Sequence, residues 1–418
     1  MIHSFPFDEC PSPVRQEQPS EGALHSLLLR QTDPLEVAAL TTQPPLHSPE
    51  RGENGGEPKR TTLRHLLTTP LGRIGIFALP LQLPPHEARS DAFQQEVLQQ
   101  TSDAIALAQA CGAQVIALCQ WLPQMTNHGL LVQQSLPLRA GQRPRLTTGE
   151  ASSLAALFLH LEQVLPMLRR DLRQERLALV GTTDALAAML HALLTVLAHP
   201  PTIIVRPLPS SAPPDIEASL MLLSTLTRHG FEGEVMWASD MGEVMAHTTL
   251  LLDLTADGLV LDSESMQSGV VALSRIPIRW RNDEHFHQRL ATREDVLLIE
   301  GGHLTSHDPL NELWLMPDPP AREDMHPLVR RASGWHTRAG RIAPLLSVDA
   351  QVLSGAIVQR GGPAVLGPLD ESAVLFHVLA LQAGGMQATP PHHGPHTWTD
   401  AFLHAFRARF GYRSRRSS

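Results

Sequence analysis

The sequence predicts an α/β protein with a doubly wound, mostly parallel sheet, preceded by a smaller α/β domain. The main observation is a βαβ pattern: the apolar run 177–180 stops at Gly181, an apolar helical segment follows, and a second apolar run occupies 202–205. Because helical segments separate further apolar runs, parallel strands are favoured; these runs lie at 234–238, 248–255, 270–274 and 296–299. Together the runs predict a Rossmann-like sheet of about six strands.

Composition is that of an ordinary globular protein. The 418 residues leave room for roughly two or three domains. A formal charge of −9 argues against a general nucleic-acid binder, which needs a basic surface. Three cysteines, Cys10, Cys111 and Cys119, form no disulfide framework, and no apolar run reaches the roughly 18 residues of a membrane span. Since no secretory signal is evident either, the sequence predicts a cytoplasmic protein.

Residues 1–60 are predicted to be a disordered tail. They are rich in Pro, Gln, Ser and Glu, and the end of the stretch has little to bury. One helix is considered between Glu21 and Leu40. We expect no chemistry from this tail.

Residues 61–153 are predicted to form the smaller α/β domain, on the substrate side. Its expected elements are a strand at 72–80, a helix at 91–110 and a strand at 115–119. The turn Thr147-Thr148-Gly149 then leads into a long helix at 154–170. The two threonine hydroxyls either bind a ligand between the domains or cap that helix.

Residues 154–316 are predicted to be a dinucleotide-binding domain. The N–H groups at Gly181, Thr182 and Thr183 would hold a pyrophosphate at the helix N-terminus. Asp184 stands where such turns have a glycine, so its carboxylate either repels the pyrophosphate or caps the helix. Arg206 follows the second strand, where an arginine suits the 2′-phosphate of NADP; alternatively it is an exposed loop residue.

Ligands of such sheets bind beyond the carboxyl ends of the strands. This rule predicts a rim made of Gly181, Arg206, Ser239, Asp253, Thr255, Ser274, Arg275, Gly301 and Gly302. His303 follows the glycine pair and is the candidate for proton transfer, because an imidazole titrates near neutral pH. The alternative is a surface histidine in a turn.

Several segments, in order along the chain, carry a resemblance to a known group. They are Ala104–Leu118, Thr126-Asn-His-Gly129, Leu146-Thr-Thr-Gly149, the turn at Gly181, and Asp295–His303. In these segments the chain resembles the cyanobacterial long-chain acyl-[acyl carrier protein] reductases and the wider group of shikimate dehydrogenases and glutamyl-tRNA reductases. The resemblance implies an NADP(H)-dependent reductase, with Asn127, Thr147 and Thr148 on the substrate.

The chain departs from this group at the catalytic cysteine. The reductases carry that cysteine on a helix after the Gly-Gly strand, whereas this chain has none beyond Cys119. The segments nearest to that helix, 353–358 and 371–377, supply no thiol. Cys119 lies at a strand end and would either replace the missing nucleophile or be a buried structural cysteine.

Residues 317–418 are predicted to be irregular, with an apolar helix at 371–383, a terminal helix at 398–412 and a basic tail. His392, His393 and His396 lie within a proline-rich stretch without a neighbouring cysteine or carboxylate. We interpret the stretch as a linker rather than a metal site.

Two functional hypotheses follow. The first is an NADP(H)-dependent oxidoreductase acting on a carbonyl or acyl thioester substrate, small or carried by a carrier protein. The second is a catalytically degenerate Rossmann-like protein that binds a metabolite or a carrier-protein partner. The altered turn at Asp184 and the missing cysteine motivate the second hypothesis.

Overall fold

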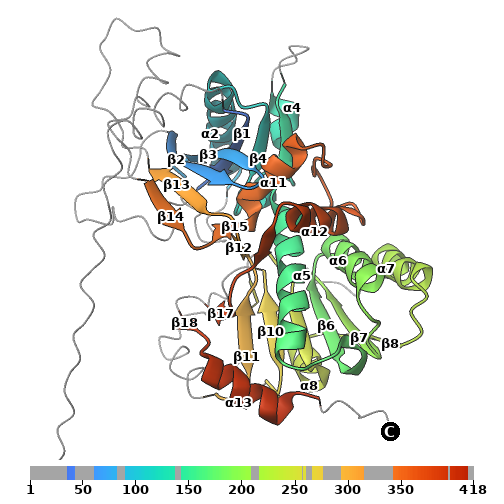
Figure 1. The fold of residues 1–418 in the computed structure, drawn as a ribbon. Helices are drawn as coiled ribbons and strands as arrows, with labels where there is room; N and C mark the ends of the chain where they lie inside the picture. Colours follow the sequence, from blue (N-terminus) through green and yellow to red (C-terminus); the bar gives the residue numbers. More distant parts are fainter. Residues whose placement is uncertain are drawn as a thin grey trace, which may run out of the picture. The chain divides into compact units, whose positions relative to one another are not determined.

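The computed structural model describes residues 35–42, 61–81, 90–136, 143–208, 216–256, 258–259, 266–275, 293–314, 342–393 and 396–412. Parallel sheets flanked by helices make up this part of the chain, which confirms the predicted mixed α/β fold (Figure 1). Apart from 35–42, the predicted tail lies outside the described residues.

The predicted Rossmann-like sheet is present. Its strands are β6 (Arg176–Gly181), β7 (Thr202–Pro207), β8 (Glu234–Trp237), β9 (Leu250–Asp253), β10 (Val271–Ser274) and β11 (Leu297–Glu300). Within the described residues the sheet has six strands, all paired in parallel, in the order β8-β7-β6-β9-β10-β11. Numbered along the chain, this order is 3-2-1-4-5-6, as in dinucleotide-binding folds.

Helices follow the strands of this sheet as the sequence predicts. They are α6 (Thr183–Val196), α7 (Ile216–Arg228) and α8 (Met241–His247). The terminal helix α13 (Asp400–Phe410) comes much later in the chain, after β18. Helix α6 consists mostly of alanine and leucine, which favour helices, and most of its side chains are buried. The segment before α13 is fixed to β11, because the indole Nε1 of Trp398 donates a hydrogen bond to the carbonyl of Leu298 at 2.7 Å.

The first half of the chain contributes most of a second sheet. Its strands are β1 (Val37–Thr41), β2 (Thr62–Thr69), β3 (Gly72–Ala78), β4 (Val115–Leu118), β5 (Arg145–Thr148), β13 (Leu310–Trp314) and β14 (Ile342–Leu345). Their order is β14-β13-β2-β3-β1-β4-β5. Between β3 and β5 the described residues form the helices α2 (Asp91–Ala110), α3 (Leu122–Met125) and α4 (Leu130–Ser135). Of these three, only α2 was predicted.

Strand β1 corrects the sequence analysis. The segment 37–41 was placed in a helix within a disordered tail, but it is a buried strand that pairs in parallel with β3 and with β4. Its two neighbours supply hydrogen bonds and burial that local composition does not show. The chain therefore enters the fold before residue 61.

Strand β13 is also placed differently from the prediction. Residues 310–314 were assigned to the Rossmann-like domain, but they pair antiparallel with β2 in the other sheet, and β14 pairs antiparallel with β13. In Figure 1 these strands, coloured late in the sequence, lie beside the early strand β2. The sequence analysis did not predict the pairing of β13 with β2, because pairing between distant segments leaves no local pattern.

The C-terminal region is more regular than predicted. It contains β12 (His303–Ser306), β15 (Val348–Asp349) and β16 (Met386–Ala388) in a small antiparallel sheet, the hairpin of β17 (His392–His393) and β18 (His396–Thr397), and the helices α11 (Ala350–Gln359) and α12 (Ala373–Ala383). The predicted helices at 371–383 and 398–412 correspond to α12 and α13.

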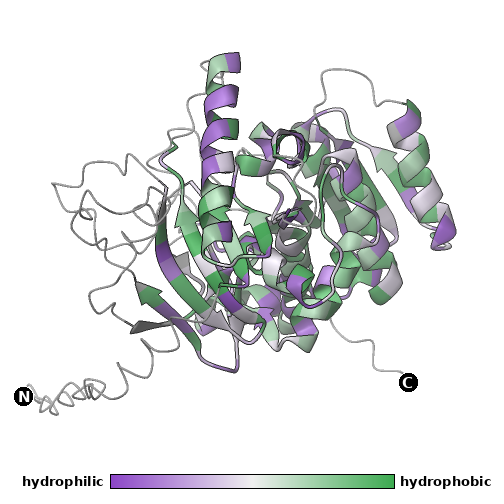
Figure 2. Ribbon diagram, turned by 90° about the horizontal axis from the view of Figure 1, so that it is seen from above, coloured by the Kyte–Doolittle hydropathy of each residue, from purple (hydrophilic) through white to green (hydrophobic). Residues whose placement is uncertain are grey.

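Helix α5 (Glu150–Met167) connects the two large sheets. It begins directly after β5, and nearly every residue in its first three turns is buried. Both α11 and α12 pack against it (Figure 1). At Gly149 a Cβ would lie 2.6 Å from the Cβ of Gln351, so only glycine allows α11 to approach this closely. In Figure 2 apolar residues, coloured green, are prominent along the strands.

Candidate functional site

Three charged side chains meet at the N-terminus of α5. Glu150, the first residue of the helix, has Oε2 2.8 Å from Nδ1 of His128 and Oε1 3.9 Å from Nη2 of Arg275. His128 follows β4, Glu150 follows β5 and Arg275 follows β10, so both large sheets contribute. Open α/β sheets bind ligands at the carboxyl ends of their strands. The cluster therefore occupies the place where a ligand is expected.

A strained turn positions His128. Asn127 and His128 both have left-handed backbones, with φ of 48° and 52°. Such a conformation costs about 1–3 kcal/mol for a residue other than glycine and is concentrated at functional sites. The turn is held by Thr126, whose Oγ1 donates to the carbonyl of Leu122 at 2.7 Å and accepts from the N–H of Gly129 at 3.2 Å. The local fold thus fixes the direction of the imidazole.

Arg275 is a buried cation with few partners among the residues that the structure describes. The residue is 5% exposed, and its Nη1 lies 3.4 Å from the carbonyl of Leu254. Its Nε has no hydrogen-bond partner among the described residues. The nearest ion pair, with Glu150, is long at 3.9 Å. A guanidinium in this setting has free capacity to bind an anion.

The charges of the cluster shift the pKa of His128 upward. The hydrogen bond to Glu150 is the largest cause, and burial opposes it. The charge of Asp184 also raises this pKa, while that of Arg275 lowers it. The imidazole therefore keeps its proton to a higher pH than a free histidine does.

Two residues of the predicted nucleotide-binding turn, Gly181 and Asp184, contact other residues of the protein. Thr182 is the N-cap residue of α6, but its side chain makes no capping hydrogen bond, and Thr183 is the first helical residue. Asp184 does not cap the helix; its Oδ2 accepts a hydrogen bond from the N–H of Leu369 at 2.8 Å. At Gly181 a Cβ would lie 2.9 Å from the Cβ of Leu254, so strand packing explains this glycine.

The other predicted cofactor residues have structural partners as well. Thr255 donates from its N–H and its hydroxyl to Asp253, at 2.9 and 2.7 Å. A Cβ on Gly301 would lie 2.7 Å from Cδ1 of Leu157, and one on Gly302 would lie 2.6 Å from the carbonyl oxygen of Arg275. Arg206 lies in β7 and is half-buried rather than in an exposed loop. NADP binding by these residues stays a prediction.

Of the predicted substrate residues, only Asn127 adjoins the cluster and is exposed. Thr147 is buried and accepts a hydrogen bond from the N–H of Val365 at 3.1 Å. Thr148 is also buried, and its hydroxyl has no partner among the described residues. Neither threonine caps α5, because the N-cap residue is Gly149 and makes no side-chain capping bond.

The two predicted catalytic residues differ in their suitability. His303 has Nδ1 3.3 Å from Oε1 of Glu300. Burial lowers the pKa of His303, but its side-chain interaction with Glu300 and the charges of Asp349 and Glu300 outweigh burial and raise this pKa. Cys119 is fully buried, and burial raises the pKa of its thiol well above the usual value. A thiol in this state is not a nucleophile near neutral pH. The buried thiol of Cys119 is therefore poorly suited to be the predicted nucleophile, and proton transfer by His303 stays a prediction.

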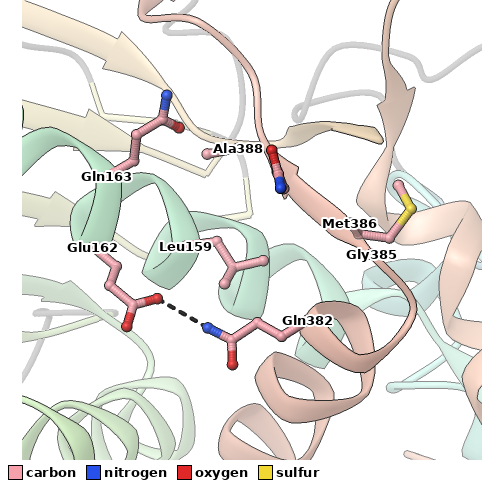
Figure 3. Close-up of a pocket in the computed structure, with 8 residues that line it drawn as sticks. Leu159, Glu162, Gln163, Gln382, Gly385, Met386 and Ala388 are labelled. Atoms are coloured by element: carbon pink, nitrogen blue, oxygen red, sulfur yellow. Dashed lines mark hydrogen bonds between the residues drawn. The ribbon is translucent and has the colours of Figure 1, made fainter. Parts of the chain in front are cut away.

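A pocket of ≈450 Å³ lies away from these residues, on the outer side of α5. Figure 3 shows its lining from α5, α12 and β16, including Leu159, Gln163 and Met386. One side is closed by a hydrogen bond of 3.0 Å from the amide of Gln382 to the carboxylate of Glu162. Neither a predicted site residue nor a member of the charged cluster lines it.

Sequence comparisons give no relative: the chain matches no family model and no curated protein. Solved structures do match. Aspartate transcarbamoylase from Trypanosoma cruzi, in complex with carbamoyl aspartate and phosphate, is 14% identical with a TM-score of 0.30, over 65% of this chain and 82% of that one. An N-acetyl-L-ornithine transcarbamylase is 12% identical with a TM-score of 0.29, over 61% and 84%. The pyrroline-2-carboxylate reductase of Thermococcus litoralis, with NADH and L-proline, is 11% identical with a TM-score of 0.22, over 34% and 45%.

These matches correct the predicted family. The transcarbamoylases among the similar structures contradict the assignment to the acyl carrier protein reductase and shikimate dehydrogenase group, which is wrong. The predicted NADP(H)-dependent oxidoreductase rested on the same resemblance and is wrong with it. Identities of 11–14% and TM-scores of 0.22–0.30 indicate a distant likeness of fold and transfer no activity to this chain.

The sequence predicts no segment that is long and apolar enough to span a membrane. Within the described ranges, none of the helices combines the length and the apolar character that crossing a bilayer requires.

Proposed function

We propose that this protein binds a small metabolite bearing a carboxylate or phosphate group at the N-terminus of α5. The observation that supports the proposal is the buried guanidinium of Arg275, whose Nε is without a partner in the described part of the chain. Leaving such a donor unsatisfied costs about 1–3 kcal/mol. Because guanidinium groups bind carboxylates and phosphates in two-pronged geometry, an anionic ligand would recover this energy.

The second part of the proposal is that His128 transfers a proton to or from the bound metabolite. Its Nδ1 faces Glu150, while 29% of its side chain is exposed. A carboxylate that fixes one imidazole nitrogen leaves the other directed at a substrate, as in other acid–base sites. The raised pKa of His128 lets the imidazole hold its proton to a higher pH than a free histidine does.

Binding is tested by thermal unfolding with three probes: inorganic phosphate, succinate and L-aspartate. We expect at least one probe to stabilise the wild type, by about 2.7 kcal/mol at 100 times its dissociation constant. Arg275→Met removes the guanidinium and should abolish this stabilisation. Arg145→Met is the matched control, because Arg145 is exposed at the opposite, amino end of β5. Equal stabilisation of all three proteins, or none with any probe, would contradict the proposed site.

Proton transfer is tested on the organic probe that binds. We expect the hydrogens beside its carboxylate to exchange with deuterium in the presence of the wild type, faster as the pH rises and His128 loses its proton and can act as the base. His128→Gln should slow this exchange while the probe still binds. Binding without exchange in the wild type would instead favour the catalytically inactive metabolite-binding protein. A carrier-protein partner and a cytoplasmic location stay predictions; a pull-down with acyl carrier protein tests the first.

A further inference from the structure

Two histidines and a glutamate from three elements converge outside the cluster at α5. Glu300 ends β11, His303 begins β12 and His392 begins β17. One potential ligand atom from each of the three lies within 4.8 Å of the other two. His392 is distant from the other two in the sequence, so the group exists only in the folded chain.

The side chains are oriented for a shared ligand. Nδ1 of His392 lies 3.0 Å from the carbonyl oxygen of Pro390, so this nitrogen donates to the backbone and Nε2 is left as an acceptor. Metal-binding histidines typically use one nitrogen in this way to fix the ring. On the other side, Nδ1 of His303 lies 3.3 Å from the carboxylate of Glu300. The two imidazole rings have centroids 6.2 Å apart.

We propose that Glu300, His303 and His392 bind a divalent transition-metal ion, with Zn²⁺ as the best match. Two imidazoles and one carboxylate, with one coordination position open, are the ligands of many catalytic zinc sites. Zinc bonds of about 2.1 Å in a tetrahedron place ligand atoms about 3.4 Å apart. The limit of 4.8 Å therefore requires each pair of ligand atoms to approach by about 1.4 Å at most.

The surroundings favour a cation and leave it a path from solvent. Asp349 is the register partner of His303 in the small sheet and adds a second carboxylate nearby. The side chain of Glu300 is 4% exposed, whereas that of His303 is 27% exposed. A buried anion beneath accessible imidazoles permits an ion to enter from the histidine side.

A second group of ligands, His191, His229 and Glu371, is less suited to bind a metal. Nδ1 of His191 and Nε2 of His229 already share a hydrogen bond of 3.0 Å. Glu371 is ion-paired with Arg228. A metal ion would have to break both interactions, so this group serves as an internal control.

The test of the metal site measures binding of the metal alone, so its result does not depend on whether the proposed metabolite binds. The full-length protein, stripped with EDTA, is titrated with ZnCl₂ by calorimetry, and its bound metal is counted after dialysis. We expect one tightly bound equivalent. Removing a ligand should lower the affinity for Zn²⁺ at least about 100-fold, since mutating residues that only hydrogen-bond to a metal ligand typically lowers metal affinity 10–100-fold. His392→Ala and Glu300→Gln test this; His392 is partly exposed, so its loss spares the core.

His229→Ala and His404→Ala are the controls, the latter because His404 is exposed on α13. Both should retain the tight equivalent, and the thermal unfolding of every variant in EDTA shows whether it is folded. Three outcomes would overturn the proposal: no tight equivalent in the wild type, the same affinity in His392→Ala and Glu300→Gln as in the wild type, or a loss confined to His229→Ala.

Discussion

The buried histidine of α12 makes stability depend on pH in a way that one substitution can isolate. His377 is fully buried, and its Nδ1 lies 2.7 Å from Oγ of Ser152 in α5. Burial lowers its pKa from 6.5 to about 4. Below pH 6.5 the unfolded chain therefore takes up a proton that the folded chain does not. The stability contributed by neutral His377 is complete above this pH and is lost as the pH falls toward 4.

The magnitude follows from the two pKa values. Between about pH 7.5 and 5, the loss at one such histidine is about 2 kcal/mol, a large part of a total stability of about 5–15 kcal/mol. His377→Gln removes the titrating group. Urea unfolding of the two proteins, in EDTA at both pH values, should show that the variant loses about 2 kcal/mol less than the wild type over this range. Other groups, such as His128 with its raised pKa, act in both proteins and cancel.

The exposed His404→Gln is the control and should lose as much stability as the wild type. A pH dependence of His377→Gln equal to that of the wild type would refute the reasoning, because it would mean that the folded chain protonates this histidine as readily as the unfolded one does.

Two further predictions concern ion pairs and thiols. Arg170→Met should lower the free energy of unfolding in urea by about 3–5 kcal/mol, because Arg170 and Glu175 form a buried ion pair. Arg228→Met removes an exposed ion pair and should lower it by less than about 1 kcal/mol. Equal losses in the two variants would contradict the burial argument. The peptide containing Cys119 should resist iodoacetamide at pH 8 in the native protein and react fully in urea, as mass spectrometry can measure; rapid native labelling would contradict a buried, protonated thiol.

The Rossmann-like sheet was predictable because its signal is local. Each strand from β6 to β11 is an apolar run with a turn or a helix beside it, and the order of runs implies parallel pairing. Strands β1 and β13 were not predictable in this way. Val37–Thr41 pairs with segments 72–78 and 115–118, and 310–314 pairs with 62–69, so their partners lie far along the chain.

The candidate site was predicted only in part. Arg275 belongs to the predicted rim, but its burial and its unsatisfied Nε depend on the tertiary structure. Glu150 and His128 were missed as functional residues. A signal for His128 existed: polar residues just before Gly129 are typical of a left-handed turn, which the structure shows at 127 and 128. No sequence pattern indicates that the carboxylate opening α5 lies between this turn and the end of β10.

The glycine at the end of β6 shows why the fold and the ligand are separate conclusions. A phosphate-binding turn needs glycine because the backbone must approach the ligand closely. Gly181 meets the same steric requirement for another reason, since a Cβ there would lie 2.9 Å from the Cβ of Leu254. The sequence alone does not show whether Gly181 is required by a bound ligand or by Leu254. The contact of Asp184 favours the second explanation, because its carboxylate in the first turn of α6 accepts a hydrogen bond from the N–H of Leu369 in the same chain. The strand order of a dinucleotide fold is thus kept, while the first turn of α6 has an internal partner. The buried Arg275, whose Nε has no hydrogen-bond partner among the described residues, follows β10 instead.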